Sequence, residues 1–400
     1  MLSWPRARTE TRSWHQTVRG GVREDRLLRE VITTIPEFLG QRTLALPAEL
    51  AARIDENTRT ISALDASHGQ TLAALGGLLL RTESVASSKI EQIVASMDDF
   101  ARAMHGSKAN SSAVAMVDAT RATRELMDAV TTRGAIASSD LLRAHATLMS
   151  SDPAELPHAG HLRTMQNWVG GSDYSPREAL LVPPPPELVP ELMEDIVQFA
   201  NRKDLPSLLQ AAIAHAQFET VHPFTDGNGR IGRALVNAIL RVRGTTSLIV
   251  VPLASALVAQ RDAYFEALNS YRAGDVEPLL NDFVTASQIA TEESAHTAAR
   301  LALIPEQWRS ELGPTRRDSA ALRVLDLLLV NPVIAAVEIE ANLSVSTSTV
   351  YASMERLQAA GIIRPLTNRT RNQIWGASAL IDELDDLSRR IETRSAKAQL

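Results

Sequence analysis

Apolar residues recur at the spacing of one helix face through most long segments of this chain. Intervals of three and four residues between apolar positions persist over 47–80, 84–105, 111–131 and 138–150. Aromatic residues make up only 4% of the 400 residues, while alanine and leucine are plentiful. Because that mixture favours helices over sheets, we expect an all-α core.

Charge and cysteine content restrict the class of protein. A formal net charge of -6 and a pI of about 5.9 do not suit a general nucleic-acid binder. The chain has no cysteine, which excludes disulfides and thiolate metal sites and agrees with a cytoplasmic location. The longest apolar stretch, 248–258, falls short of the roughly 18 residues of a membrane span, so we expect no membrane partner.

Breaks in the helical pattern divide the chain into five parts. Gly170-Gly171 and four prolines at 183–186 interrupt the third part with a long ordered loop. The predicted parts are 1–39 (an N-terminal arm, polar and mobile over its first 30 residues), 40–110 (a helical region), 111–303 (the main helical domain), 304–318 (a polar linker) and 319–400 (a C-terminal domain ending in a helix).

The C-terminal domain has the pattern of a winged helix-turn-helix: three helices followed by a small hairpin. Ser346 is the expected N-cap of the third helix, which ends at Gly361, and a polar turn at 367–372 joins the strands of the wing. DNA binding is one option for this domain. However, only the wing is locally basic, so packing or partner docking is the preferred interpretation.

The segment HPFTDGNGRIGR, residues 222–233, interrupts two helices with a tight, polar loop. Gly227 and Gly229 allow the backbone to turn sharply and let an anion come close. The helix that begins near Asn228 offers unpaired N–H groups and a positive dipole end. Arg230 and Arg233 lie three residues apart and therefore project from one face, where they can bind phosphates in a bidentate manner.

Two further side chains in this loop supply chemistry. Asp226 lies at the mouth of the anion site, and one carboxylate together with phosphate oxygens is how magnesium is usually held. His222 can accept a proton near neutral pH. The set predicts phosphoryl or nucleotidyl transfer, in which His222 takes the proton of an attacking hydroxyl and that oxygen attacks the α-phosphate of ATP.

The glycines also fit a dinucleotide fingerprint, Gly227-x-Gly229-x-x-Gly232, but this interpretation fails on its context. It needs a preceding strand and an acid about 20 residues further on. The segment before the loop is helical by spacing, and 245–258 contains no acid. His158 and His161 likewise lack a further ligand at a spacing that would suit a metal.

The loop resembles the signature of Fic domain proteins, H-x-F-x-D/E-G-N-G-R-x-x-R, and matches every specified position. The stretches GHLRTMQNWVGG, VPPPP and AQFETVHPF resemble the same family, so the resemblance covers roughly 40–300. It implies a Fic-type helical core with a short β-hairpin flap near 161–182, where Trp168 would lie, and a winged helix as a frequent companion. It also implies a protein adenylyltransferase, which moves AMP from ATP to a Ser, Thr or Tyr hydroxyl of target proteins or of itself, with ATP and Mg²⁺ bound.

The resemblance assigns roles to individual residues. His222 is the base and Asp226 the magnesium ligand. Tyr264, in RDAYFEAL, resembles the residue that contacts the adenine end; a half-buried helix tyrosine is the equal alternative. The remaining nucleotide contacts implied are Gly227, Asn228 and Gly229 as the anion hole, Arg230 and Arg233 on the outer phosphates, and Ile231 and Gly232 in the same turn.

A second family motif, S/T-x-x-x-E-G/N on an inhibitory helix, resembles Ser87 to Gln92. Gln92 departs from it, since the motif ends in Gly or Asn. The resemblance implies an inhibitory helix at about 84–97, with Ser87 and Glu91 as regulatory residues. Glu91 would pair with Arg233 and occupy the space of the γ-phosphate, which leaves ATP in an unproductive pose.

Two other functions stay open at this point. The same site could remove AMP from a target, with Glu91 orienting water, or move another phosphate-bearing group. Alternatively, the chain could be a DNA-binding regulator with a nucleotide-sensing domain, although the intact His222, Asp226 and Arg233 argue against an inactive sensor. A homodimer is compatible with the sequence, and the target protein is not identified by it.

Overall fold

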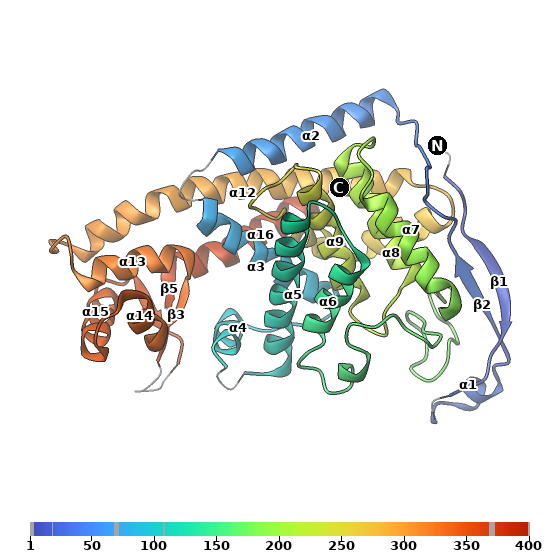
Figure 1. Cartoon of the computed structure of the whole chain (residues 1–400), viewed down its shortest axis with the longest axis horizontal. Helices are drawn as coiled ribbons and strands as arrows, with labels where there is room; N and C mark the ends of the chain where they lie inside the picture. The colour runs from blue at the N-terminus through green and yellow to red at the C-terminus, as the bar shows by residue number, and fades with distance from the viewer. Residues whose placement is uncertain (1–3, 18, 68–71, 107–108, 368–372, 399–400) are drawn as a thin grey trace. The chain divides into compact units, whose positions relative to one another are not determined.

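The computed structural model describes the chain except residues 1–3, 18, 68–71, 107–108, 368–372 and 399–400. Helices dominate, with two small antiparallel sheets, as the composition predicted (Figure 1). The described residues form two compact units, each built from separated stretches of sequence. The first contains 1–59, 121–245 and 260–285, and the second contains 60–120, 246–259 and 286–400.

Helix α8, Ser207–Val221, is the centre of the first unit. All of its residues are buried, including the polar Gln210, His215, Gln217 and Glu219. It packs against α7, α9 and α11. The helices that belong wholly or largely to this unit are α1 (Arg23–Leu27), α2 (Ala48–Ala66), α5 (Ser111–Arg133), α6 (Ser138–Leu148), α7 (Val189–Ala200), α9 (Asn228–Val242) and α11 (Arg261–Arg272), with short 3-10 helices at Leu156–His158 and Pro186–Leu188.

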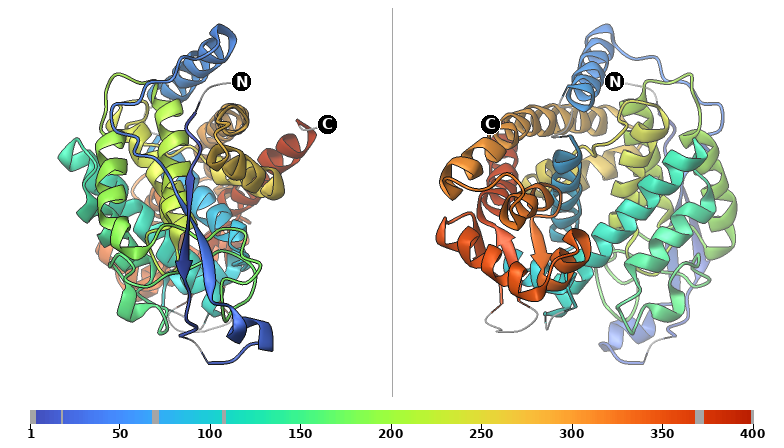
Figure 2. Two further views of the ribbon diagram at one scale, coloured as in Figure 1. Left: turned by 90° about the vertical axis from the view of Figure 1, so that its right-hand side faces the viewer. Right: turned by 60° about the vertical axis from the view of Figure 1, so that its left-hand side comes forward.

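The N-terminal arm is a folded β-hairpin, which corrects the expectation of a polar, mobile segment. Strand β1, Arg8–Ser13, pairs antiparallel with β2, Glu30–Ile35 (Figure 2). Trp14 and Val31 are each 7% exposed and pack with Val182 of the predicted flap. The arm folds because it buries apolar side chains against a segment distant in sequence, which its own polar composition does not reveal.

The second unit contains α3 (Leu72–Ile90), α4 (Met97–Met104), α10 (Leu253–Ala259), most of α12 (Glu277–Leu312) and the C-terminal elements. Helix α3 packs against α10, α13 and α16. The C-terminal elements are α13 (Ala320–Val330), β3 (Val333–Ala335), α14 (Ala336–Leu343), α15 (Thr347–Ala359), β4 (Ile363–Pro365), β5 (Ile374–Ala377) and α16 (Ser378–Lys397).

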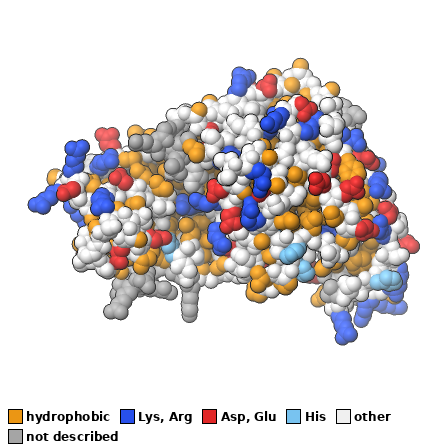
Figure 3. Space-filling view, viewed as in Figure 1, with side chains coloured by type: hydrophobic (Ala, Val, Ile, Leu, Met, Phe, Trp, Pro, Cys, Tyr) orange, Lys and Arg blue, Asp and Glu red, His pale blue; other side chains and the backbone are white. Residues whose placement is uncertain are grey.

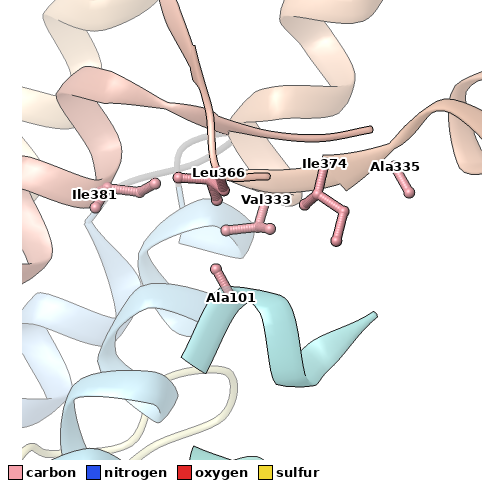
Figure 4. Close-up of a cluster of buried hydrophobic side chains, with 6 residues drawn as sticks. All are labelled: Ala101, Val333, Ala335, Leu366, Ile374 and Ile381. Carbon is pink, nitrogen blue, oxygen red and sulfur yellow. The ribbon is translucent and has the colours of Figure 1, made fainter. Parts of the chain in front are cut away.

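Three of these helices and the antiparallel sheet β3-β5-β4 follow the order expected of a winged helix-turn-helix, with β3 as an additional strand. The predicted Ser346 cap is present, since its hydroxyl accepts from the Thr349 amide. Most of the predicted wing turn lies outside the described residues. Helix α4 contributes Ala101 to the buried cluster beneath this sheet (Figure 4). Assigning these elements to a winged-helix domain stays an interpretation.

The predicted linker at 304–318 is wrong over most of its length, because α12 continues through Pro305 to Leu312. The apolar positions Leu301, Ile304, Trp308 and Leu312 are all buried and keep the helical spacing. Their burial outweighs the roughly 3 kcal/mol that a proline costs inside a helix. Among the described residues, no helix is long and apolar enough to cross a membrane.

Candidate functional site

The loop between α8 and α9 is held by two residues in left-handed conformation. His222 caps the C-terminus of α8 at φ 47°, and its amide donates to the Phe218 carbonyl. Gly227 precedes α9 at φ 75°, a conformation that glycine adopts without steric cost. A non-glycine residue in this region is uncommon and is typically kept at functional positions. The backbone thus places the imidazole and the start of α9 on one short loop.

Asn228 closes this loop through its side chain. Its Oδ1 accepts from the Phe224 amide at 2.8 Å, and its Nδ2 donates to the Phe224 carbonyl at 2.9 Å. The first turn of α9 is closed by the Ile231 amide, which donates to Gly227. The preceding amides of α9, from Asn228 to Arg230, are donors that a helix start offers to an anion. The Asn228 side chain therefore also fixes the shape of the loop, a role that the sequence did not predict.

Asp226 and Arg230 form the polar rim of the loop. Arg230 Nη2 lies 3.1 Å from Asp226 Oδ2; the carboxylate side chain is 56% exposed and that of Arg230 only 6%. The Arg230 Nε is buried and has no hydrogen-bond partner among the described residues. This guanidinium thus keeps donor capacity for a phosphate. The described residues contain no group of three His, Cys, Asp or Glu that could bind a metal by itself. Asp226 therefore suits a cation such as Mg²⁺ whose other ligands are phosphate oxygens.

The rest of the first turn of α9 packs inward. Ile231 is 1% exposed and Arg233 is 3% exposed. A Cβ on Gly232 would lie 2.6 Å from Glu219 Oε1 and 3.1 Å from His215 Nδ1 of α8. Ile231 and Gly232 thus lie on the side of α9 that faces the core, and Gly232 lies at the close contact between α8 and α9. Their predicted contact with the nucleotide stays a prediction.

Tyr264 lies in the core of the first unit. It is 2% exposed, and its hydroxyl is 2.8 Å from Nε2 of the buried His215. Tyr264 is therefore more deeply buried than the half-buried helix tyrosine of the alternative, and the adenine contact stays a prediction. His215 was not identified from the sequence.

His145 on α6 supports the loop from beneath and was also missed. It is 0% exposed, and its ring stacks on Phe224 with centroids 3.8 Å apart. The Gly160 amide donates to Nδ1 at 2.9 Å, and Nε2 lies 3.1 Å from the Asp226 carbonyl. Burial lowers the pKa of His145 to about 4. The imidazole is therefore neutral, and its single proton is on Nε2, donated to Asp226.

Arg163 holds the other side of the loop. It is 3% exposed and donates to four carbonyls: His222 at 2.8 Å, Val221 at 3.2 Å, Met165 at 3.1 Å and Pro184 at 2.6 Å. Its own amide donates to Pro223. Burial lowers its pKa to about 10, so it stays charged at neutral pH. A buried cation at the C-terminal end of α8 also complements the helix dipole. Arg163 belongs to GHLR, the start of a stretch that resembles the Fic family, but the sequence predicted no role for it.

The predicted flap contains one antiparallel bridge, between Val169 and Leu181. Trp168 donates its indole N–H to the Ser172 carbonyl at 2.7 Å and packs edge-on against Trp14 at 5.6 Å. The Thr34 amide of β2 donates to the Val182 carbonyl. The N-terminal hairpin thus extends and supports the flap. His158 and His161 are part of no metal-binding group among the described residues.

The helix predicted at 84–97 as inhibitory is wrong in its bounds, because α3 begins at Leu72 and ends at Ile90, and α4 begins at Met97. Its inhibitory role stays a prediction. Ser87 is buried on α3, while Glu91 is exposed in the turn that follows. Glu91 belongs to the second unit and Arg233 to the first, so their pairing stays a prediction.

Gln92 explains why α3 stops there. It has a φ of 62°, and the next amide, of Ile93, donates back to the Ser88 carbonyl. This is a Schellman helix end, whose left-handed residue is usually Gly and sometimes Asn. The final Gly or Asn of the motif therefore stands at the left-handed position that ends the helix. In this chain Gln92 occupies that position, and its Cβ makes the conformation sterically unfavourable.

Replacing Gln92 by glycine is expected to stabilise the protein by about 1 kcal/mol, because it removes the Cβ strain of the left-handed conformation. Denaturant unfolding measures the change. Gln92→Ala is the matched control, since alanine keeps the Cβ and should give no such gain. Equal stability of the two variants would contradict the claim that the Cβ of Gln92 strains the backbone.

The comparisons with known proteins agree with this geometry. Residues 135–240 match the model of the Fic/DOC family. That segment is therefore similar to the Fic domain. The matched segment runs from the turn before α6 into α9 and includes His145, Arg163 and the whole loop from His222 to Arg233.

Curated relatives resemble part of the chain. Protein adenylyltransferase fic-1 of Caenorhabditis elegans is 34% identical over 149 residues, which are 36% of this chain and 26% of the relative. A probable protein adenylyltransferase of Aquifex aeolicus is 39% identical over 95 residues, 24% of this chain and 27% of the relative. The chain therefore spans about a quarter of the length of these relatives.

Solved structures share the fold over a longer stretch. A Fic family protein from Desulfovibrio desulfuricans G20 aligns with a TM-score of 0.52 and 20% identity, covering 85% of this chain and 98% of that one. A fragment of Fic-1 from C. elegans aligns with a TM-score of 0.52 and 22% identity, covering 63% of this chain and 74% of that one. Both have the helical Fic fold.

Proposed function

We propose that this chain is a protein adenylyltransferase that moves AMP from ATP to a side-chain hydroxyl of a target protein. The observation that carries the proposal is the loop between α8 and α9. There a half-buried imidazole, an exposed carboxylate and the amide-rich start of a helix stand within a few residues. The Fic/DOC family model matches the segment that contains this loop, and relatives named as protein adenylyltransferases match part of the chain.

In the proposed reaction, His222 removes the proton from the target hydroxyl. The freed oxygen forms a bond to the α-phosphorus of ATP, the bond to the β-phosphate oxygen breaks, and pyrophosphate leaves with that electron pair. The amides at the start of α9 face the negative phosphate oxygens, while Arg230 and Arg233 contact the outer phosphates. Asp226 would hold Mg²⁺, which neutralises phosphate charge when bound.

Labelling with two forms of ATP tests the proposal. A label on the α-phosphate should enter a target protein, and a label on the γ-phosphate should not. Mass spectrometry should then find the mass of AMP on a Ser, Thr or Tyr residue. Transfer of the γ-label would identify a kinase instead. Loss of AMP from a previously modified target, with no forward labelling, would favour the de-AMPylation alternative.

Glu91 is proposed to restrain this activity, since it occupies the position of the motif's glutamate. Replacing it by glycine should raise AMP transfer by roughly 10- to 100-fold, because a charged hydrogen bond of about 1.5–3 kcal/mol to the competing arginine is lost. The initial rate of α-label incorporation measures the effect.

The matched control for Glu91→Gly is Asp98→Gly, which removes another exposed carboxylate close by on α4. Its rate should stay near that of the wild type. Equal rates for Glu91→Gly and the wild type would remove the inhibitory role while leaving the transferase proposal intact.

The C-terminal elements are proposed to dock a protein partner rather than DNA. Arg364 pairs with Asp382 at 3.0 Å, and Arg356 donates to the Pro314 carbonyl at 3.0 Å, so both are engaged within the chain. Basic and acidic side chains are interspersed on the face shown in Figure 3. A gel shift whose affinity falls steeply with salt would favour DNA instead. A cytoplasmic location is proposed from the absence of cysteine.

A further inference from the structure

We propose that His145 is a positioning residue that fixes the backbone at Asp226 and thereby presents the Asp226 carboxylate and the α9 amides to the nucleotide. The inference rests on the proposed function, since it concerns the same site. His145 comes from α6, about 80 residues before the loop, and nothing in the local motif contains it.

Three contacts define how this imidazole is held. Its ring lies flat on Phe224, with an interplanar angle of 4°. The Gly160 amide donates to Nδ1 at 2.9 Å, and this bond forces the ring proton onto Nε2. Nε2–H then donates to the Asp226 carbonyl, 3.1 Å away. One buried ring thus joins the segment after α6 to the residue that carries the carboxylate.

The position of that carbonyl matters because it lies directly before Gly227, whose left-handed backbone starts α9. A Cβ on Gly227 would meet Met149 Cε at 2.3 Å and Leu148 Cδ2 at 2.8 Å, so the end of α6 lies against this turn. Stacking excludes water beneath the loop, and the Nε2 bond sets the direction of the peptide between Asp226 and Gly227. A preorganised amide and carboxylate need no rearrangement when charge develops on the phosphates.

Two variants separate the hydrogen bonds from the packing. His145→Phe keeps a ring against Phe224 but makes neither hydrogen bond, while His145→Gln keeps a side-chain N–H at about the reach of Nε2. His158→Gln is the matched control, because it changes a half-buried histidine on the neighbouring 3-10 helix.

Amide hydrogen exchange of the protein without nucleotide tests the inference independently of any activity. In His145→Phe, peptides that cover 222–230 and Gly160 should exchange faster, while peptides from α7 and α11 should not. His145→Gln should restore slow exchange at 222–230 but not at Gly160, and His158→Gln should match the wild type. Unchanged exchange at 222–230 in His145→Phe would overturn the proposal, as would faster exchange across the whole first unit.

Calorimetric binding of ADP, with Mg²⁺ and with EDTA, gives the second readout. Mg²⁺ should raise the affinity for ADP about 10-fold less in His145→Phe than in the wild type, which corresponds to the loss of one hydrogen bond of about 1.4 kcal/mol. The affinity for ADP in EDTA should be nearly unchanged. In the transfer assay the KM for Mg-ATP should rise in line with the weaker Mg²⁺-dependent binding, and kcat should fall as well, with partial rescue of both by His145→Gln. An equal loss with and without Mg²⁺ would show a merely structural role and sink the proposal. If the wild type binds Mg-ADP but transfers no AMP, the proposed function is wrong. Hydrogen exchange and ADP binding would then still test whether His145 positions the loop.

Discussion

Replacing His222 by alanine is expected to reduce AMP transfer by about 10²- to 10⁴-fold, the usual contribution of a general base. The imidazole is the group in the loop that can accept a proton near neutral pH, and its left-handed backbone at the end of α8 fixes where it stands. Nucleotide affinity should change little, because the proposed site binds the phosphates through the α9 amides, Arg230 and Arg233 rather than through His222. The measurements are α-label incorporation and calorimetric titration with ATP.

Two controls make the His222 result specific. The alanine variant should unfold at the denaturant concentration of the wild type or slightly below it, since His222 is half-buried and its backbone bond to Phe218 remains. His158→Ala should keep the wild-type rate. If His222→Ala still labels a target at the wild-type rate, the imidazole is not the base. If it loses nucleotide binding as well, the residue acts mainly in binding.

The loop could be predicted from the sequence because its determinants are local. Gly227 and Asn228 stand where the chain must turn and restart a helix, and the spacing of apolar residues in 208–220 marks α8 without tertiary information. The structure places each of them as expected, and it adds the side-chain bridge from Asn228 to Phe224.

The supports of the loop could not be predicted, because their partners are distant in sequence. His145 lies on the buried face of α6 and looks like an ordinary core histidine, while its acceptor is the carbonyl of Asp226. Arg163 contacts carbonyls that lie 21 to 59 residues further along the chain, at Pro184 and His222. Neither pairing has a spacing that a sequence pattern would reveal.

The two wrong element predictions have the same physical origin. Residues 1–30 were predicted to be a mobile arm because Trp14 and Val31 find their apolar partner, Val182, only in the folded chain. Pro305 favoured a linker because proline disfavours a helix locally, whereas the neighbouring Ile304 and Trp308 are buried and keep α12 continuous. In both cases tertiary burial of apolar surface outweighed local propensity.

Replacing Arg163 by methionine should lower the free energy of unfolding by about 3–5 kcal/mol. Methionine keeps the length and apolar stem of the side chain but leaves the buried carbonyls of Val221 and Pro184 without their side-chain donor, and each such group costs about 1–3 kcal/mol. The loss of a cation at the C-terminus of α8 adds to this. Urea unfolding of the purified protein measures the change.

Arg42→Met is the matched control for this effect. Arg42 also donates to a carbonyl, that of Phe38 at 2.7 Å, but its side chain is 38% exposed, so water can replace it. It should cost below about 1 kcal/mol. Arg163→Lys should fall between the two variants, because an ammonium keeps the charge but cannot reach four carbonyls with a planar fork. A loss below about 1 kcal/mol for Arg163→Met would mean that the loop after α8 does not depend on this cation.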